Sequence, residues 1–193
     1  MTQQQLLLKR FFDLLLALLL FIPVVILTLP LLLLSALDTK SNGLFMQERI
    51  GQYGKTFQML KLRTLKPGQH VLGQLDASAS AYGKWLRRHK LDELPQLWHV
   101  LTGAMSFVGP RPDVAGYADM LEGDDRIILT IKPGITGPAT LKYKEEECLL
   151  AMQPDAELYN RTVIWPDKVE INKKYANNWS FYLDLKLIIK SII

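Results

Sequence analysis

Hydrophobic residues are concentrated in one long run near the start of the chain. Residues 14 to 37 contain no charged residue, and this run is long enough to cross a hydrocarbon core of about 30 Å as a helix. Pro23 and Pro30 lie within it, and each proline removes a backbone hydrogen bond and bends a helix. The pattern therefore predicts a membrane-embedded helix that is broken or kinked near its middle.

Basic residues flank this run on both sides, with Lys9 and Arg10 before it and Lys40 and Arg49 after it. Positive residues favour the cytoplasmic side of a membrane. A helical hairpin that is broken at Pro23, and that enters and leaves by the same face, satisfies both flanks. The alternative is a kinked helix that spans the bilayer, and the residues alone leave both topologies open.

Shorter patterns follow. Residues 44–47 and 56–60 have the composition of short strands, and the glycine-containing segment 51–55 would join them as a hairpin. Residues 66–80 are rich in glycine and small polar residues and predict an irregular loop. Residues 132–138 predict a second loop, in which glycines allow a ligand to approach the backbone closely.

Helices are predicted at about 81–90, from 92 or 93 to 102, and, with an interruption, at 113–131. The tail from 164 to 193 carries aromatic residues and lysines, as in a helix that lies on a bilayer, although a buried core helix fits equally well. The expected fold is a mostly helical α+β protein. Its expected parts are a membrane anchor at 1–38 and a cytoplasmic domain at 39–193 with a short β-hairpin and membrane-surface helices.

The net charge of +4 and the pI near 9.1 suit contact with anionic headgroups or phosphorylated substrates. No nucleic-acid recognition motif accompanies the basic residues, and the apolar anchor argues against a nucleic-acid partner. The single cysteine, Cys148, excludes an intrachain disulfide and a cysteine-rich metal site.

Two adjacent carboxylates, Asp92 and Glu93, follow a basic segment and precede an apolar helical pattern. Asp92 is placed like an N-cap, with Pro95 in the first turn, where the N–H missing from proline is tolerated. A carboxylate at a helix N-terminus is held ionised by the helix dipole. The segment suits a metal-bound diphosphate substrate, but these residues alone favour a simpler interpretation, a surface helix with a charged first turn.

Cations recur at two other places. Lys61 and Arg63 alternate along the second predicted strand and so share a face. Arg111 lies between Pro110 and Pro112, which restrict its backbone, and a rigid guanidinium is well suited to bidentate phosphate binding. Each feature alone also fits a solvent-exposed edge or turn.

Five segments in a fixed order resemble a known family, the bacterial sugar transferases called monotopic phosphoglycosyl transferases. These segments are Lys9–Asp13, Lys61–Thr64, Leu91–Gln96, Met105–Pro112 and Lys132–Gly137. The resemblance covers nearly the whole chain, whose length matches the minimal catalytic form. It favours a catalytic Asp-Glu pair over a capped surface helix.

The resemblance implies a re-entrant anchor with its break at Pro23, in the bacterial inner membrane, with the catalytic domain facing the cytoplasm. It also implies transfer of a phosphosugar from a UDP-sugar to polyprenyl (undecaprenyl) phosphate, with release of UMP, as the first membrane step of glycan assembly. A homodimer is possible. The competing interpretation is a non-catalytic, membrane-anchored scaffold of a glycan-assembly complex.

The resemblance also assigns roles to residues. Asp92 is the expected nucleophile and Mg²⁺ ligand, and Glu93 is expected to place the metal or to deprotonate the lipid phosphate. The expected substrate-binding residues are Lys61, Arg63, Arg87, Pro110, Arg111, Pro112, Thr136 and Gly137. One departure concerns residues 138–147, where the family usually has Trp-Ala-Gln and an arginine-containing segment. This departure puts nucleotide and sugar contacts near Gly137 in doubt, and the sequence does not identify the sugar.

Overall fold

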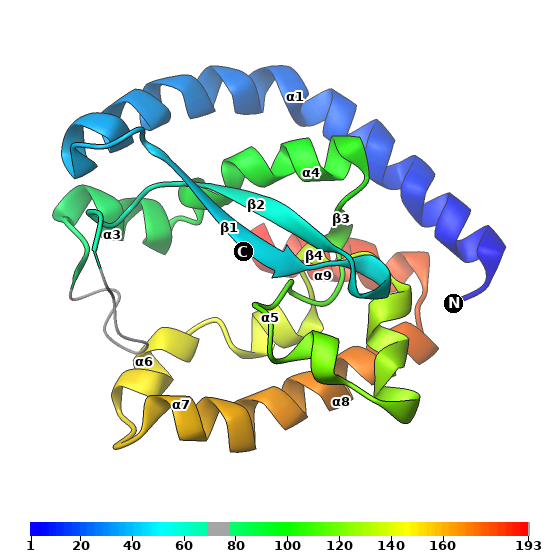
Figure 1. Ribbon diagram of the computed structural model, residues 1–193. Helices are drawn as coiled ribbons and strands as arrows, with labels where there is room; N and C mark the ends of the chain where they lie inside the picture. Colours follow the sequence, from blue (N-terminus) through cyan, green and yellow to red (C-terminus); the bar gives the residue numbers. More distant parts are fainter. Residues whose placement is uncertain (69–77, 193) are drawn as a thin grey trace.

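The computed structural model describes residues 1–68 and 78–192 (Figure 1). Most of the described chain is helical, and the strands pair two by two. The helices are α1 Gln3–Thr39, α3 Ala81–Arg88, α4 Leu97–Thr102, α5 Pro138–Lys142, α6 Glu146–Ala151, α7 Ala156–Tyr159, α8 Trp165–Asn177 and α9 Phe181–Ile192. The strands are β1 Leu44–Ile50, β2 Thr56–Leu62, β3 Ser106–Val108 and β4 Gly134–Thr136. The predicted mostly helical α+β class is confirmed.

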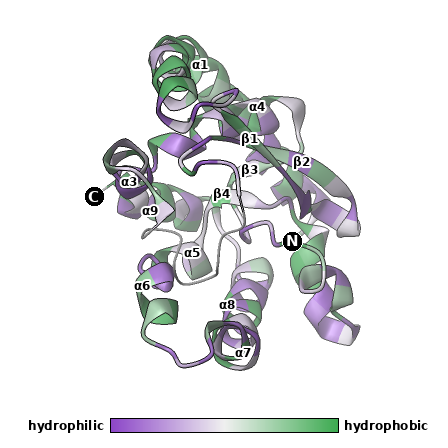
Figure 2. Cartoon of the chain, turned by 60° about the vertical axis from the view of Figure 1, so that its left-hand side comes forward, coloured by the Kyte–Doolittle hydropathy of each residue, from purple (hydrophilic) through white to green (hydrophobic). Residues whose placement is uncertain are grey.

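Helix α1 is one continuous helix that contains both Pro23 and Pro30. It arches over one side of the molecule, above α4 and the β1–β2 hairpin, and is hydrophobic along most of its length (Figures 1 and 2). Among the described residues it is the one helix long and apolar enough to cross a membrane. The predicted long apolar N-terminal helix is confirmed. The break expected at Pro23 is absent, because the helix continues through both prolines.

Helix α1 packs against the rest of the protein along one face, most closely near its two ends. Its buried residues recur every four positions in two groups, Lys9, Asp13 and Ala17, then Leu31, Ser35 and Thr39. The segment 18–30 between these groups contains no buried residue. The first group faces α4, β3 and α9, and the second faces the hairpin and α3. In this middle segment Leu20 and Val24 still pack, partly buried, against the core cluster around Val100, while most of the other residues are exposed.

Strands β1 and β2 form the predicted antiparallel hairpin, which is longer than expected because Glu48–Ile50 and Lys61–Leu62 also pair. Leu62 is buried and packs with Leu31 of α1 and Leu86 of α3. This packing fixes one face of β2 and leaves the Lys61 side chain on the other.

Strands β3 and β4 form a parallel pair that was not predicted from the sequence, because residues 132–138 were assigned to a loop. Glycines make the close pairing possible. A Cβ atom on Gly134 would lie 2.1 Å from the nitrogen of Gly109, and one on Gly137 would lie 2.1 Å from its carbonyl oxygen. These glycines therefore allow a close approach of the chain's own backbone.

Two helix predictions differ from the structure, one throughout and the other in its first part. Residues 113–131 do not form an α-helix but contain two 3₁₀ segments, Ala118–Met120 and Gly123–Thr130. The α-helix expected from 92 or 93 to 102 begins only at Leu97, because residues 91–96 form a 3₁₀ helix that leads into α4. Most of the loop predicted at 66–80 lies outside the described residues.

Candidate active site

The acid pair lies in the 3₁₀ helix Leu91–Gln96, between α3 and α4. Lys90, in the left-handed conformation with φ 56°, precedes this helix, and no side chain caps it. The expected N-cap role of Asp92 was therefore wrong, because Asp92 lies within the first turn. Asp92 and Glu93 are only 7% and 8% exposed, so both carboxylates are in surroundings where an unpaired charge is costly.

Glu93 is held between two cations. Lys61 Nζ on β2 and a terminal nitrogen of Arg111 donate to the same Oε1 atom, at 2.9 and 2.8 Å. Burial by itself raises the pKa of Glu93, but Arg111 and Lys61 outweigh it and hold this pKa well below its usual range. Glu93 is therefore a fixed anion that joins two segments distant in sequence.

Asp92 differs from Glu93 in its hydrogen bonding and in the direction of its pKa shift. Its Oδ1 atom is buried and has no hydrogen-bond partner. Burial raises the pKa of Asp92, Lys61 opposes this rise and Glu93 adds to it. Burial therefore opposes the effect expected of a helix dipole, which is to hold Asp92 ionised. A carboxylate oxygen that is desolvated and unpartnered is available to react or to bind a cation.

The loop that carries Arg111 is held by backbone contacts on two sides. The N–H of Ile50 donates to the carbonyl of Asp113 at 2.8 Å, and the N–H of Gly134 donates to the carbonyl of Pro110 at 2.8 Å. Arg49 donates to the carbonyl of Pro112 at 3.3 Å. The prolines thus support the position of Arg111 through their carbonyl groups.

Sequence reasoning missed three residues that support the site, Asp113, His99 and Arg49. Burial raises the pKa of Asp113 to about 6, and Lys168 and Arg49 oppose the rise. His99 on α4 accepts the N–H of Leu60 through Nε2 at 3.0 Å, and so ties α4 to the strand that carries Lys61. Asp113 directly follows the Pro-Arg-Pro motif, which was an available signal. Neither Arg49 nor His99 belongs to such a motif.

The structure brings some of the other expected site residues to the acid pair and not others. Arg87 is near enough to lower the pKa of Asp92. Arg63 instead donates to the carbonyl of Leu44 at 3.1 Å and lies over the Phe45 ring. Thr136 shares a 2.6 Å hydrogen bond with Ser191 on α9. Gly137 packs against Gly109, and Pro23 is exposed on α1. Substrate contacts by Arg63, Thr136 and Gly137 stay predictions.

A Mg²⁺ ion fits the donor set on one side of the pair. Within residues 1–68 and 78–192 no group of three potential metal-binding side chains occurs. Mg²⁺ does not require one, because it commonly uses one or two carboxylates together with substrate phosphates and water. Oδ1 of Asp92 is an unused oxygen ligand of this kind. Glu93 is already neutralised by Lys61 and Arg111 and is the poorer candidate.

Arg111→Lys is expected to lower the rate of the reaction at this site by about 10²-fold, the effect of losing one preorganised donor. Arg111 uses one terminal nitrogen for Glu93 and, with 35% of its side chain exposed, keeps further N–H groups for a ligand, which a lysine cannot reproduce. Steady-state rates test this. Arg161→Lys, in an exposed ion pair with Glu157, is the matched control. Near-normal turnover of Arg111→Lys would reassign Arg111 to a structural turn.

Known proteins similar to this chain include a sugar transferase and an exopolysaccharide production protein. The chain is 33% identical to the uncharacterized sugar transferase EpsL of Bacillus subtilis, over 94% of this chain and 83% of EpsL. It is 29% identical to the exopolysaccharide production protein ExoY of Sinorhizobium fredii, over 95% of this chain and 83% of ExoY.

A longer relative carries a specific name. The chain is 33% identical to the UDP-glucose:undecaprenyl-phosphate glucose-1-phosphate transferase of Escherichia coli, over 96% of this chain but only 39% of that protein. The family profile described as bacterial sugar transferase matches residues 4–193. This match spans α1, the hairpin, the acid pair and α9, and the chain belongs to the bacterial sugar transferase family.

Proposed function

We propose that the protein is a phosphoglycosyl transferase that moves a phosphosugar from a UDP-sugar to polyprenyl phosphate through a covalent intermediate on Asp92. The observation that carries this proposal is the buried, unpartnered Oδ1 of Asp92 beside a glutamate fixed by two cations. The named activity of the longer relative supports the same donor and acceptor classes.

The reaction takes two steps. An oxygen of Asp92 attacks the sugar-bearing phosphorus of the donor, the bond from this phosphorus to the oxygen of UMP breaks, and UMP leaves. A phosphate oxygen of polyprenyl phosphate then attacks the same phosphorus, and the Asp92 carboxylate is released as polyprenyl-diphosphate-sugar forms. A nucleophilic carboxylate divides one difficult transfer into two easier ones. A Mg²⁺ ion bound at Asp92 would neutralise charge on the donor diphosphate.

Glu93 has a positioning role in this proposal. Its depressed pKa makes it a weak proton acceptor, which argues against the alternative in which it deprotonates the lipid phosphate. Its bonds instead hold Lys61 and Arg111 beside Asp92. These two cations, with Arg87, would bind donor phosphates and stabilise the negative charge of the transition state.

The pH dependence of kcat/KM should have an acidic limb set by Asp92. The reacting form is the carboxylate, so activity is present above the pKa of Asp92 and is lost as the pH falls through it. Because burial raises this pKa, the loss at limiting Mg²⁺ should be half complete above pH 3.8, the ordinary value, and bound Mg²⁺ would move it to lower pH. Initial rates between pH 4 and 8 measure this limb, and circular dichroism at each pH controls for unfolding. A rate unchanged down to pH 4 would contradict it.

The placement of α1 also belongs to this proposal. Both ends of α1 are attached to the same body while segment 18–30 contains no buried residue, which supports a helix that enters and leaves the bilayer on the cytoplasmic face of the inner membrane. Helix α9 and the acid pair would then lie near the headgroups, where the phosphate of the acceptor is found.

Labelling in spheroplasts tests this topology. A Thr2→Cys variant in a Cys148→Ser background should react with a membrane-impermeant maleimide only after lysis. The Cys148 substitution is needed because this thiol is exposed. Cys148 alone, in the unsubstituted protein, serves as the reporter of the domain. Labelling of the Thr2→Cys variant in intact spheroplasts, without labelling of Cys148 in the unsubstituted protein, would show a spanning helix.

The function itself is tested by incubating purified protein with Mg²⁺, polyprenyl phosphate and a panel of UDP-sugars, with UMP release as the readout. Release with one or a few sugars, dependent on the lipid acceptor, is the expected result. A scaffold protein would release no UMP with any donor, and that outcome would favour the non-catalytic alternative.

A further inference from the structure

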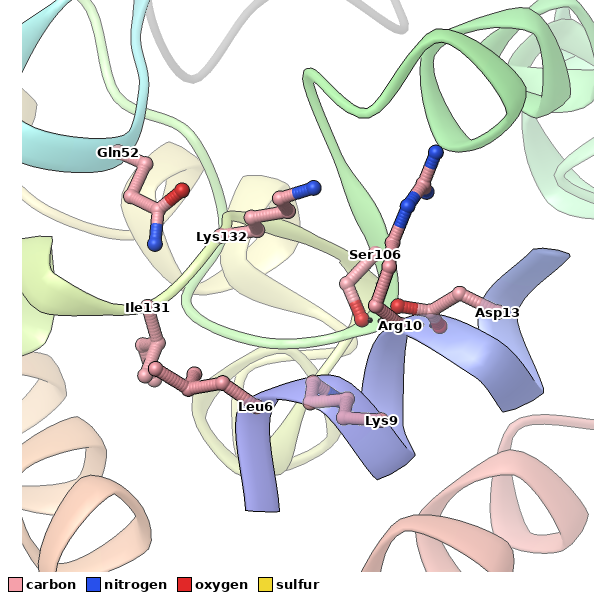
Figure 3. A pocket seen from close by; sticks show the side chains of 8 residues that line it. All are labelled: Leu6, Lys9, Arg10, Asp13, Gln52, Ser106, Ile131 and Lys132. Carbon is pink, nitrogen blue, oxygen red and sulfur yellow. Dashed lines mark hydrogen bonds between the residues drawn. The ribbon is translucent and has the colours of Figure 1, made fainter. Parts of the chain in front are cut away.

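A pocket of about 70 Å³ lies where the N-terminal half of α1 meets the segments before β3 and β4 (Figure 3). Its polar lining includes Lys9, Arg10 and Asp13 of α1, together with Ser106 and Lys132. This volume holds a few water-sized groups, which suits a group the size of a phosphate. The acid pair does not line this pocket.

Most charged groups around the pocket already have partners. Lys9 is ion-paired with buried Asp184 of α9. Arg10 donates to two backbone carbonyls at the end of α4, at 2.6 and 2.9 Å. Asp13 accepts hydrogen bonds of 3.1 Å from the hydroxyl of Ser106 and from the next backbone N–H of β3. These bonds fix the walls of the pocket.

Lys132 differs from these groups. Among the described residues no carboxylate lies within ion-pair distance of its amino group, although the side chain is only partly exposed. Burial lowers the pKa of Lys132, and Arg10 lowers it further. Within residues 1–68 and 78–192, the carboxylates beside Lys9, Arg10 and Lys132 are Asp13 and Asp184, so one of the three positive charges is left unbalanced there.

Gly103 shows that the two cations converge on one place. A Cβ atom on Gly103 would lie 3.2 Å from Nζ of Lys132 and 3.3 Å from a terminal nitrogen of Arg10. Like charges that approach the same small space repel one another, and an anion between them would remove this repulsion. Phosphate oxygens accept charge-assisted hydrogen bonds from both kinds of donor.

The surface of α1 indicates the source of the anion. Leu7, Phe11 and Leu15, one turn apart, are 69%, 67% and 55% exposed and form an apolar stripe that continues toward the middle of the helix. Acyl chains would cover this stripe, since exposed apolar patches mark lipid or protein contacts. Lys9 and Arg10 lie where the uncharged run begins, which is the level of lipid headgroups.

We propose that this pocket binds the phosphodiester of an anionic phospholipid, with Lys132 as its main ligand and Arg10 as the second. A phosphodiester supplies one negative charge, which balances the unmatched cation. The bound lipid is a structural neighbour of α1 and not the reacting acceptor. The inference rests on the proposed bilayer placement of α1 and not on the transfer reaction.

Titration of the purified full-length protein in neutral detergent with dihexanoyl-phosphatidylglycerol tests the proposal. The apparent affinity is obtained from the rise in thermal midpoint. Lys132→Gln should weaken it about tenfold, the effect of losing one charged hydrogen bond. Lys132→Arg should retain it. So should Lys174→Gln, which removes the same charge from an exposed pair with Glu170.

Three results would overturn the proposal. The first is equal affinity of Lys132→Gln and the unsubstituted protein. The second is equal stabilisation by dihexanoyl-phosphatidylcholine, which would remove the charge argument. The third is equal stabilisation by inorganic phosphate, which would assign the pocket to free phosphate. The last two use the unsubstituted protein, so they apply even if Lys132→Gln does not fold. Lipid binding by a protein that is inactive in transfer would support this inference and reject only the proposed function.

Discussion

Asp92→Asn is expected to abolish sugar-phosphate transfer, with a loss of at least about 10³-fold, as for removal of a catalytic nucleophile. The amide keeps the shape of the side chain but is not a nucleophile at neutral pH. Because Oδ1 of Asp92 has no hydrogen-bond partner, the substitution breaks no bond to that atom. It also removes a buried charge, so the folded protein should be as stable as the unsubstituted one or slightly more so.

Two measurements separate this result from a general defect. Incubation with a UDP-sugar labelled in the sugar, without acceptor, should leave label on the unsubstituted protein and none on Asp92→Asn. Asp124→Asn, which removes an exposed carboxylate, is the matched control and should behave normally. Recovery of label on another residue, or brisk turnover by Asp92→Asn, would refute the assignment of the nucleophile.

Glu93→Gln is expected to damage both the site and the fold. The substitution leaves Lys61 and Arg111 without their shared anion, in surroundings where Lys61 is only 16% exposed. Breaking such a pair should lower the free energy of unfolding by about 3 kcal/mol, the low end of the range for buried pairs, since the Arg111 side chain is 35% exposed. Misplaced cations should lower the rate by about 10²-fold.

Chemical denaturation and steady-state kinetics measure the two effects. Glu157→Gln, in an exposed ion pair, is the matched control and should cost less than about 1 kcal/mol. Adding Lys61→Met to Glu93→Gln removes one unpaired cation and should restore part of the stability without restoring activity. If Glu93→Gln kept both normal stability and normal rates, the ion pairs of Glu93 would have no role in the site.

Much of this arrangement could be predicted from local sequence. The uncharged run predicted the long apolar helix, and the composition of residues 44–60 predicted the hairpin, because each signal lies within one continuous segment of the sequence. The Asp-Glu pair and Arg111 were recognisable from their neighbours. That the acid pair and Arg111 lie at one site was expected from the family resemblance. In the structure, Arg111 and Lys61 both donate to Glu93.

The features that were missed depend on contacts between distant segments. A three-residue parallel pairing such as β3 with β4 leaves no periodic pattern in the sequence. The glycines of this loop were expected to allow a ligand close to the backbone, but in the structure they allow the backbone of Gly109 to approach. The 3₁₀ geometry at 91–96 differs from an α-helix by its hydrogen bonds and not by composition. His99 carried no sequence signal at all, because its partner is a backbone N–H on β2.

The attachment of α1 at both ends has a mechanical consequence. In the proposed bilayer placement, a helix attached to the body at two separated places would set both the depth and the tilt of that body in the membrane, whereas a single linker would leave the body free to tilt. Long-chain lipids would then exchange at this enzyme by sideways diffusion within one leaflet, with no rocking of the catalytic body between turnovers.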